Sequence, residues 1–139
     1  MRIFLDANVL FSAAVTPDGR SSALIELCGP AGHVLLASRH AISEARRNLE
    51  RKRPDALDGF DRLVVPVVDE VPEPPAALVR RGAEAGLPDT DAPILAAAMA
   101  CTADLLVTGD RRHFATLFGQ HFHGVLVCSL ADAIALLLA

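Results

Sequence analysis

Short apolar runs alternate with longer amphipathic segments along the 139-residue chain. The short runs are candidate strands at residues 3–5, 33–37, 63–68, 103–108 and 124–128. Strands and helices in alternation are typical of a parallel sheet that is covered by helices on both faces. The pattern therefore predicts one α/β domain over residues 1–139, with three α/β/α layers around a central, mainly parallel sheet of about five strands.

Helices are expected between these strands, where apolar residues recur at helical spacing. They should cover residues 8–15, 21–28, 38–52, 75–85, 92–102, 111–118 and 129–139. Ser38 and Ser129 are candidate N-caps of the helices that they begin. Residues 92–102 are apolar on nearly all sides, so their helix should be buried. The run at 63–68 contains Pro66, which limits it to an edge strand or an irregular one.

Composition narrows the class of protein. Apolar residues make up 52% of the chain and charged residues 22%, which is typical of a globular domain. Neither Trp nor Tyr occurs, which disfavours a surface of aromatic platforms for stacking bases. The three cysteines form no CxxC pair, so a reducing cytoplasm is expected. Residues 133–139 are too short an apolar run to cross a bilayer, which needs about 20 residues, so no membrane association is expected.

Acidic residues follow the candidate strands. Asp6 comes directly after the first strand, and Asp110 follows the strand at 103–108. Parallel strands end at the same edge of a sheet, where open α/β folds bind their ligands. Asp89 and Asp91 lie in the turn before the buried helix, and Glu44 lies in the helix after the second strand. Four separate segments can thus bring carboxylates to one rim.

Carboxylates that cluster at neutral pH must be neutralised by protons or by a cation. Oxygen ligands favour Mg²⁺ or Mn²⁺ over zinc. Such an ion can activate a water and stabilise the charge that develops on a phosphate during hydrolysis. The acids therefore indicate a metal-dependent phosphodiesterase.

Each acid also has a simpler explanation, namely helix capping or a turn for Asp89, Asp91 and Asp110, and a solvated helix face for Glu44. Asp6 is the hardest to explain in this way, because an acid within an apolar run must be paired, capped or liganded. Asn8 could orient Asp6 through its amide, or could itself cap the first helix.

Two blocks resemble a known family. "FLDANVLFSA" near the N-terminus and "DTDAPILAAAMACTADLLVTGDRRHF" toward the C-terminus, with an acid in the helix after the second strand, are similar to PIN-domain proteins. The greatest likeness is to the bacterial ones that are toxin components of toxin–antitoxin systems, and it covers essentially the whole chain. The resemblance implies a PIN-like fold and a metal-dependent endoribonuclease that uses Mg²⁺ or Mn²⁺.

The resemblance also implies site residues. The catalytic and metal-binding acids would be Asp6, Glu44, Asp91 and Asp110. Asn8 and Thr108 match the polar positions that accompany these acids. Asp91 is preferred to Asp89 because it begins "DAPILAAA", and Asp89 would assist through water. Glu50 is a rival to Glu44 on the same helix.

The formal net charge of −4 does not exclude a nucleic-acid substrate, because the arginines are clustered. Arg111 and Arg112 follow Asp110 directly and are candidate phosphate contacts. The basic residues of segment 46–53 are better explained as a solvated helix face. His113 lies close to the rim in sequence and is a candidate substrate contact. The resemblance further implies an RNA substrate, a homodimer and a cognate antitoxin partner.

Two alternatives stay open at this stage. One is a phosphatase of the haloacid-dehalogenase type with an aspartyl nucleophile, but that chemistry normally needs a second acid where this chain has Asn8. The other is a non-catalytic PIN-fold module that binds RNA or protein and whose acids are structural. Trapping a phosphoaspartate would reveal the first, and metal titration would distinguish the second.

Overall fold

The computed structural model describes all residues, 1–139, and its strands form one six-stranded sheet in the order β3-β2-β1-β4-β6-β5. The strands are β1 (Arg2–Leu5), β2 (Val34–Ser38), β3 (Asp69–Val71), β4 (Leu105–Val107), β5 (His121–Phe122) and β6 (Val125–Cys128). All neighbours pair in parallel except β5, which is antiparallel to β6. The predicted α/β class with a mainly parallel sheet is confirmed, although the sheet has six strands rather than about five.

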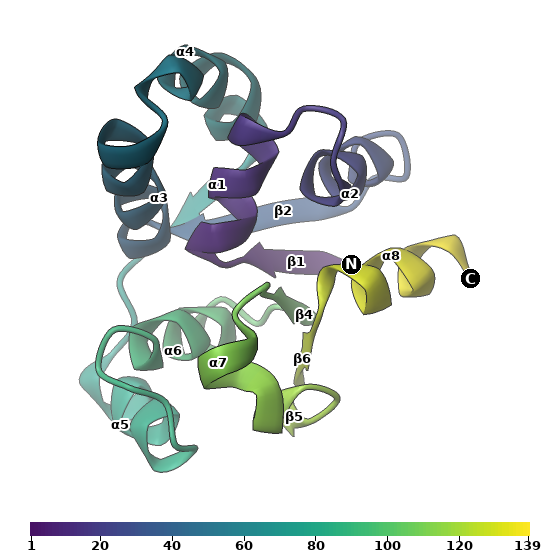
Figure 1. Ribbon diagram of the computed structural model, residues 1–139. Helices are drawn as coiled ribbons and strands as arrows, with labels where there is room; N and C mark the ends of the chain where they lie inside the picture. Colours follow the sequence, from purple (N-terminus) through teal and green to yellow (C-terminus); the bar gives the residue numbers. More distant parts are fainter.

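Helices cover both faces of this sheet, which gives the three layers (Figure 1). One side carries α1 (Ala7–Val15), α2 (Arg20–Cys28), α3 (Arg39–Lys52) and the short α4 (Leu57–Gly59), with α8 (Leu130–Leu138) packed against α2. The other side carries α5 (Ala76–Glu84), α6 (Ala92–Ala100) and the single turn α7 (Arg111–Phe114). None of these helices combines the length and the apolar character that a membrane span requires.

Ser38 and Ser129 cap helices, as the sequence predicts. Ser38 Oγ accepts a hydrogen bond from the Ala41 amide at 3.1 Å, which begins α3. Ser129 Oγ accepts one from the Asp132 amide at 3.1 Å, which begins α8. Each cap satisfies a backbone donor that has no partner within its helix. These local signals therefore fix where two of the predicted helices start.

The prediction for residues 63–68 is wrong. The chain there forms a π turn at Phe60–Val64 and a 3₁₀ turn at Val65–Val67, and the edge strand β3 follows them. Phe60 and Val64 are buried, four residues apart, as on one face of a helix. Pro66 sits near the start of the 3₁₀ turn, where its missing amide hydrogen costs nothing.

Strand β5 was not predicted from the sequence, because it is only two residues long. It joins β6 through a turn in which His123 and Gly124 have positive φ angles of 51° and 83°. A two-residue strand carries too few side chains to show an alternating pattern. The turn therefore was the only local signal of this hairpin.

A single core of 37 buried residues joins the two helical layers through the sheet. As predicted, α6 is buried, from Ala92 through Met99 except for Pro93. Its N-terminal end is set by a close crossing with α5, because a Cβ atom at Gly82 would lie only 2.7 Å from the Ala92 carbonyl oxygen. The crossing matters for the site, since Asp91 directly precedes Ala92.

Candidate active site

The site begins where β1 and β4 end side by side. Leu5 pairs with Val107, so the next residues, Asp6 and Thr108, lie at the same edge of the sheet. The Asp6 amide donates to the Val107 carbonyl at 3.0 Å, and the Thr108 amide donates to the Cys128 carbonyl of β6 at 3.1 Å. Three strands therefore fix the backbone beneath the site.

Asp6 is held by three donors. Its Oδ1 accepts from the Ala7 amide at 2.7 Å, and its Oδ2 accepts from Thr108 Oγ1 at 2.8 Å and from Asn8 Nδ2 at 3.2 Å. The residue is only 3% exposed. Burial raises the pKa of Asp6 to about 6, although the Thr108 and Ala7 hydrogen bonds lower it. Near neutral pH this carboxylate is thus ionised at an electrostatic cost.

Asn8 joins the start of α1 to the turn after β4. Its Oδ1 accepts from the Gly109 amide at 2.7 Å, and its Nδ2 donates to Asp6 and, at 3.3 Å, to Thr108 Oγ1. Thr108 Oγ1 in turn accepts from the Asp110 amide at 3.1 Å. Asn8 and Thr108 therefore position the two acids through a continuous hydrogen-bond network. Asn8 does not cap α1, because Asp6 does.

Asp110 caps α7 and also faces the site. Its Oδ1 accepts from the Arg112 and His113 amides at 3.0 and 3.1 Å. Its Oδ2 lies 2.9 Å from His113 Nδ1. Capping occupies one carboxylate oxygen and leaves the other to contact His113 at the cavity, so the two interpretations of Asp110 are compatible.

Asp91 stands at the N-terminus of α6, but its side chain makes no capping hydrogen bond. The residue is 9% exposed, and its Oδ2 is buried with no hydrogen-bond partner. Burial raises the pKa of Asp91, and His113 acts in the opposite direction. Helix capping thus does not explain this side chain. Asp89 is exposed and does not line the cavity that holds Asp91.

Of the two candidate acids on α3, Glu44 faces the cluster. It lines the same cavity, whereas Glu50 is exposed and lies outside it. Burial, followed by the neighbouring Asp6 carboxylate, raises the pKa of Glu44. Asn48 and Lys52 line the cavity too, and sequence reasoning missed them. Their spacing of four and eight residues from Glu44 was the available signal, since it places all three on one helix face.

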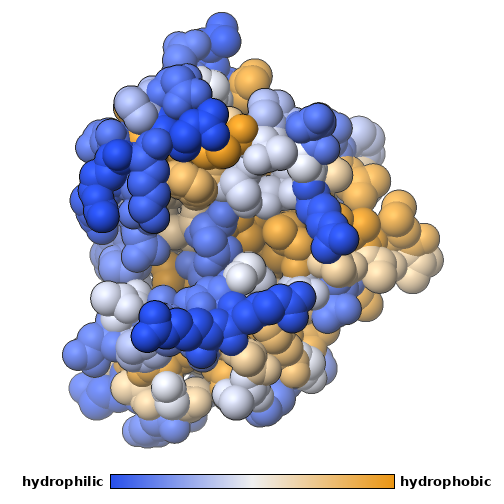
Figure 2. Space-filling view, viewed as in Figure 1, coloured by the Kyte–Doolittle hydropathy of each residue, from blue (hydrophilic) through white to orange (hydrophobic).

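These side chains surround a cavity of about 330 Å³. Its lining residues are Asp6, Ala7, Asn8, Phe11, Glu44, Asn48, Lys52, Thr90, Asp91, Asp110 and His113. Four carboxylates from four segments meet here, and the donor set fits a hard divalent cation. Arg111 and Arg112 are exposed on α7 and are not part of the lining. In Figure 2, hydrophilic side chains gather over α3 and across α7, on either side of this region.

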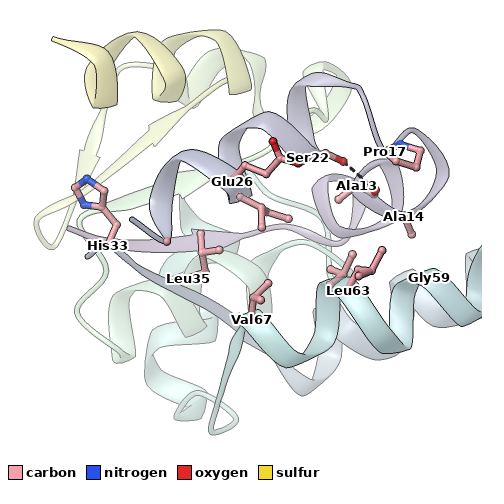
Figure 3. Close-up of a pocket in the computed structure, with 13 residues that line it drawn as sticks. Ala13, Ala14, Pro17, Ser22, Glu26, His33, Leu35, Gly59, Leu63 and Val67 are labelled. Carbon is pink, nitrogen blue, oxygen red and sulfur yellow. Dashed lines mark hydrogen bonds between the residues drawn. The ribbon is translucent and has the colours of Figure 1, made fainter. Parts of the chain in front are cut away.

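A second cavity, of about 460 Å³, is larger but has a different character (Figure 3). It lies between α1, α2, β2 and the helical turns after α4, and most of the labelled side chains are apolar. Glu26 and His33 are its only ionisable residues. This cavity therefore lacks the clustered carboxylates of the first, and its Ser22 hydroxyl is bonded to the Ala13 and Thr16 carbonyls.

Comparisons with known proteins identify the family and the fold. Residues 2–112 match the family model described as PIN domain. No protein of curated function matches the sequence. Among solved structures, PAE2754 from Pyrobaculum aerophilum aligns with a TM-score of 0.69 at 20% identity, covering 99% of this chain and 90% of that one.

Two further structures come from toxin–antitoxin systems. VapBC2 from Rickettsia felis, bound to a DNA fragment from its promoter, aligns with a TM-score of 0.69 at 15% identity over 93% of this chain and 98% of that one. VapC20 from Mycobacterium tuberculosis, described as a Sarcin-Ricin loop cleaving toxin, aligns with a TM-score of 0.60 at 20% identity over 82% and 94%. At these identities the likeness demonstrates a common fold. The family match, which spans most of the sequence, establishes that the chain belongs to the PIN domain family.

Proposed function

We propose that the protein is a metal-dependent endoribonuclease of the cytoplasm and the toxin component of a toxin–antitoxin pair. The observation that carries the proposal is the meeting of Asp6, Glu44, Asp91 and Asp110 in one cavity. Four acids from separate segments are costly to gather, since their charges repel. A bound Mg²⁺ or Mn²⁺ would remove that cost.

The residues present suit such an ion. The buried Oδ2 of Asp91 accepts no hydrogen bond and suits a cation, and Asp6 and Asp110 are already fixed by neighbouring donors. When bound, a divalent cation lowers the pKa of a water and stabilises the charge that develops on a phosphate. Glu44 has a raised pKa and is less buried than Asp6 and Asp91, which suits it to accept a proton from an attacking water.

Basic residues beside the cavity favour a substrate that carries phosphate groups. Lys52 reaches the lining from α3, and Arg111 and Arg112 are exposed on α7 next to Asp110. We assign to these three side chains the binding of RNA phosphates that flank the cleaved bond. RNA is preferred to DNA as the substrate because VapC20, a structural neighbour, is described as a toxin that cleaves the Sarcin-Ricin loop.

The proposed protein partner is a cognate antitoxin. Several structural neighbours are complexes, among them VapBC2 and FitAB bound to DNA, which favours the same organisation here. The homodimer that the family resemblance implies is likewise part of the proposal. Light scattering of the purified chain, alone and with the product of a neighbouring gene, measures both associations.

Cleavage assays test the central claim. Structured and unstructured RNAs are incubated with the protein in Mg²⁺, Mn²⁺ or EDTA, and the products are resolved on gels. Cleavage should require the metal and disappear in Asp6→Asn and Asp110→Asn. Glu50→Gln is the matched control, because this exposed acid lies on α3 outside the cavity. Undiminished cleavage in EDTA and in Asp6→Asn would refute the assignment.

A further inference from the structure

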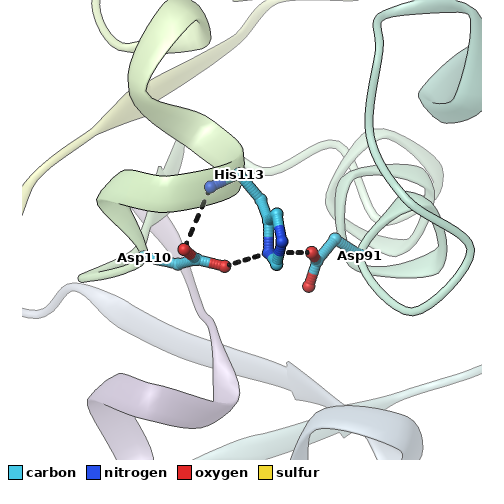
Figure 4. A group of neighbouring side chains, drawn as sticks. All are labelled: Asp91, Asp110 and His113. Atoms are coloured by element: carbon cyan, nitrogen blue, oxygen red, sulfur yellow. Dashed lines mark hydrogen bonds and ion pairs between the residues drawn. The ribbon is translucent and has the colours of Figure 1, made fainter.

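One imidazole stands between two of the acids. His113 Nδ1 lies 2.9 Å from Asp91 Oδ2 and 2.9 Å from Asp110 Oδ2 (Figure 4). Nδ1 carries at most one proton, which points in one direction. The hydrogen bond it makes is with Asp110, so Asp91 Oδ2 accepts no hydrogen bond although it is buried. A hydrogen-bonded imidazole therefore does not complete this cluster.

A cation at the same place would complete it. The three donor atoms all lie within 4.8 Å of one another, and they come from the residue before α6 and from the start of α7. An octahedral ion with bonds of about 2.1 Å has neighbouring ligand atoms about 3.0 Å apart. The two nitrogen-to-oxygen distances of 2.9 Å match that spacing closely. Replacing the Nδ1 proton by a metal ion thus gives every donor a partner with little movement.

We propose that His113 Nδ1 is a metal ligand together with Asp91 and Asp110, and that this nitrogen makes the site prefer Mn²⁺ to Mg²⁺. The inference rests on the proposed function, because it concerns the same metal site. Mg²⁺ selects oxygen ligands and dehydrates reluctantly, whereas imidazole suits first-row transition metals. His113 lies one turn after Asp110, so the backbone of α7 aims both side chains at the same ion.

Direct metal binding to the intact protein tests this proposal. Calorimetry measures the affinities for Mn²⁺ and Mg²⁺, and pulsed electron paramagnetic resonance of the bound Mn²⁺ detects coupling to a ¹⁴N ligand. The wild type should show that coupling and bind Mn²⁺ at least about tenfold more tightly than Mg²⁺. His113→Gln should lose the coupling and about tenfold in Mn²⁺ affinity, with a much smaller change for Mg²⁺.

Two further variants sharpen the result. His113→Asp supplies an oxygen in place of the nitrogen, so it should still bind metal, without ¹⁴N coupling and with its preference moved toward Mg²⁺. His121→Gln is the control, because this exposed histidine on β5 lies outside the cluster. Mn²⁺ bound without ¹⁴N coupling, or with equal affinity in His113→Gln, would overturn the nitrogen ligand while leaving the nuclease proposal intact. Absence of any Mn²⁺ or Mg²⁺ binding to the wild type would overturn both.

Discussion

Asp6→Asn should stabilise the metal-free protein at neutral pH while abolishing its response to metal. The folded structure raises the pKa of Asp6 from 3.8 to about 6, chiefly by burial. At about 1.4 kcal/mol per pH unit, this difference corresponds to about 3 kcal/mol. Because the folded pKa is the higher one, the contribution of Asp6 to stability is fully present below pH 3.8 and is lost as the pH rises through about 6.

Asparagine removes the charge but keeps the shape. Its oxygen can still accept from the Ala7 amide, and its NH₂ group can donate to Thr108 Oγ1 once that hydroxyl, which donates to Asp6 in the wild type, turns its proton away. The NH₂ group would then face the Asn8 amide donor, which lies 3.2 Å from Asp6 Oδ2. This mismatch costs about 1 kcal/mol, so the net gain at pH 7.5 should be about 2 kcal/mol. For a domain of this size that corresponds to a rise of about 6 °C in Tm.

Urea denaturation in EDTA at pH 4 and pH 7.5 measures the effect. The difference between wild type and Asp6→Asn should be present at pH 7.5 and absent or reversed at pH 4. Added Mn²⁺ should then raise the Tm of the wild type and leave that of Asp6→Asn unchanged. A variant that is less stable than the wild type at pH 7.5, or a difference that does not depend on pH, would refute the reasoning.

Three other substitutions probe the surroundings of the site. Thr108→Val removes a buried donor to a carboxylate, so the free energy of unfolding at pH 7.5 should fall by about 2 kcal/mol, and by less at pH 4 where Asp6 is neutral. Gly82→Ala places a Cβ atom against α6 and should cost about 1–3 kcal/mol in urea denaturation, whereas Gly59→Ala, which meets no atom within 4 Å, should be nearly neutral or mildly stabilising. Lys52→Gln should raise the KM for RNA several-fold with little change in kcat, and equal loss in both would contradict a role in binding phosphate.

The sequence predicted the parts of the fold that leave a hydrophobic pattern over several residues. Apolar runs located β1, β2, β4 and β6, and helical spacing located the major helices within a few residues. It failed at 63–68, where β-branched residues suggested a strand but burial of Phe60 and Val64 favoured helical turns. Local propensity is weak there, and tertiary packing decides.

The position of the candidate site at one edge of the sheet was predictable from the sequence, but the contacts between its side chains were not. Asp6 and Asp110 follow from the rule that parallel strands end at one edge, and the structure brings their side chains into one cavity. Their catalytic roles stay predictions. Arg111 and His113 differ by two positions on one helical turn, so one points outward and the other meets Asp91. The contact between His113 and Asp91 depends on where the fold places α6. The spacing of residues within α7 does not give that placement.

The pairing of β6 beside β4 has a consequence for how such a protein is made. Every acid of the cavity lies before residue 111, yet the backbone that carries Thr108 is anchored to Cys128 on β6. A ribosome that has synthesised all four acids has therefore not yet produced the strand to which the Thr108 backbone, beside Asp6, is bonded. On the proposed function, we expect the nascent chain to leave RNA intact until its final segment emerges, so the topology would delay the onset of cleavage.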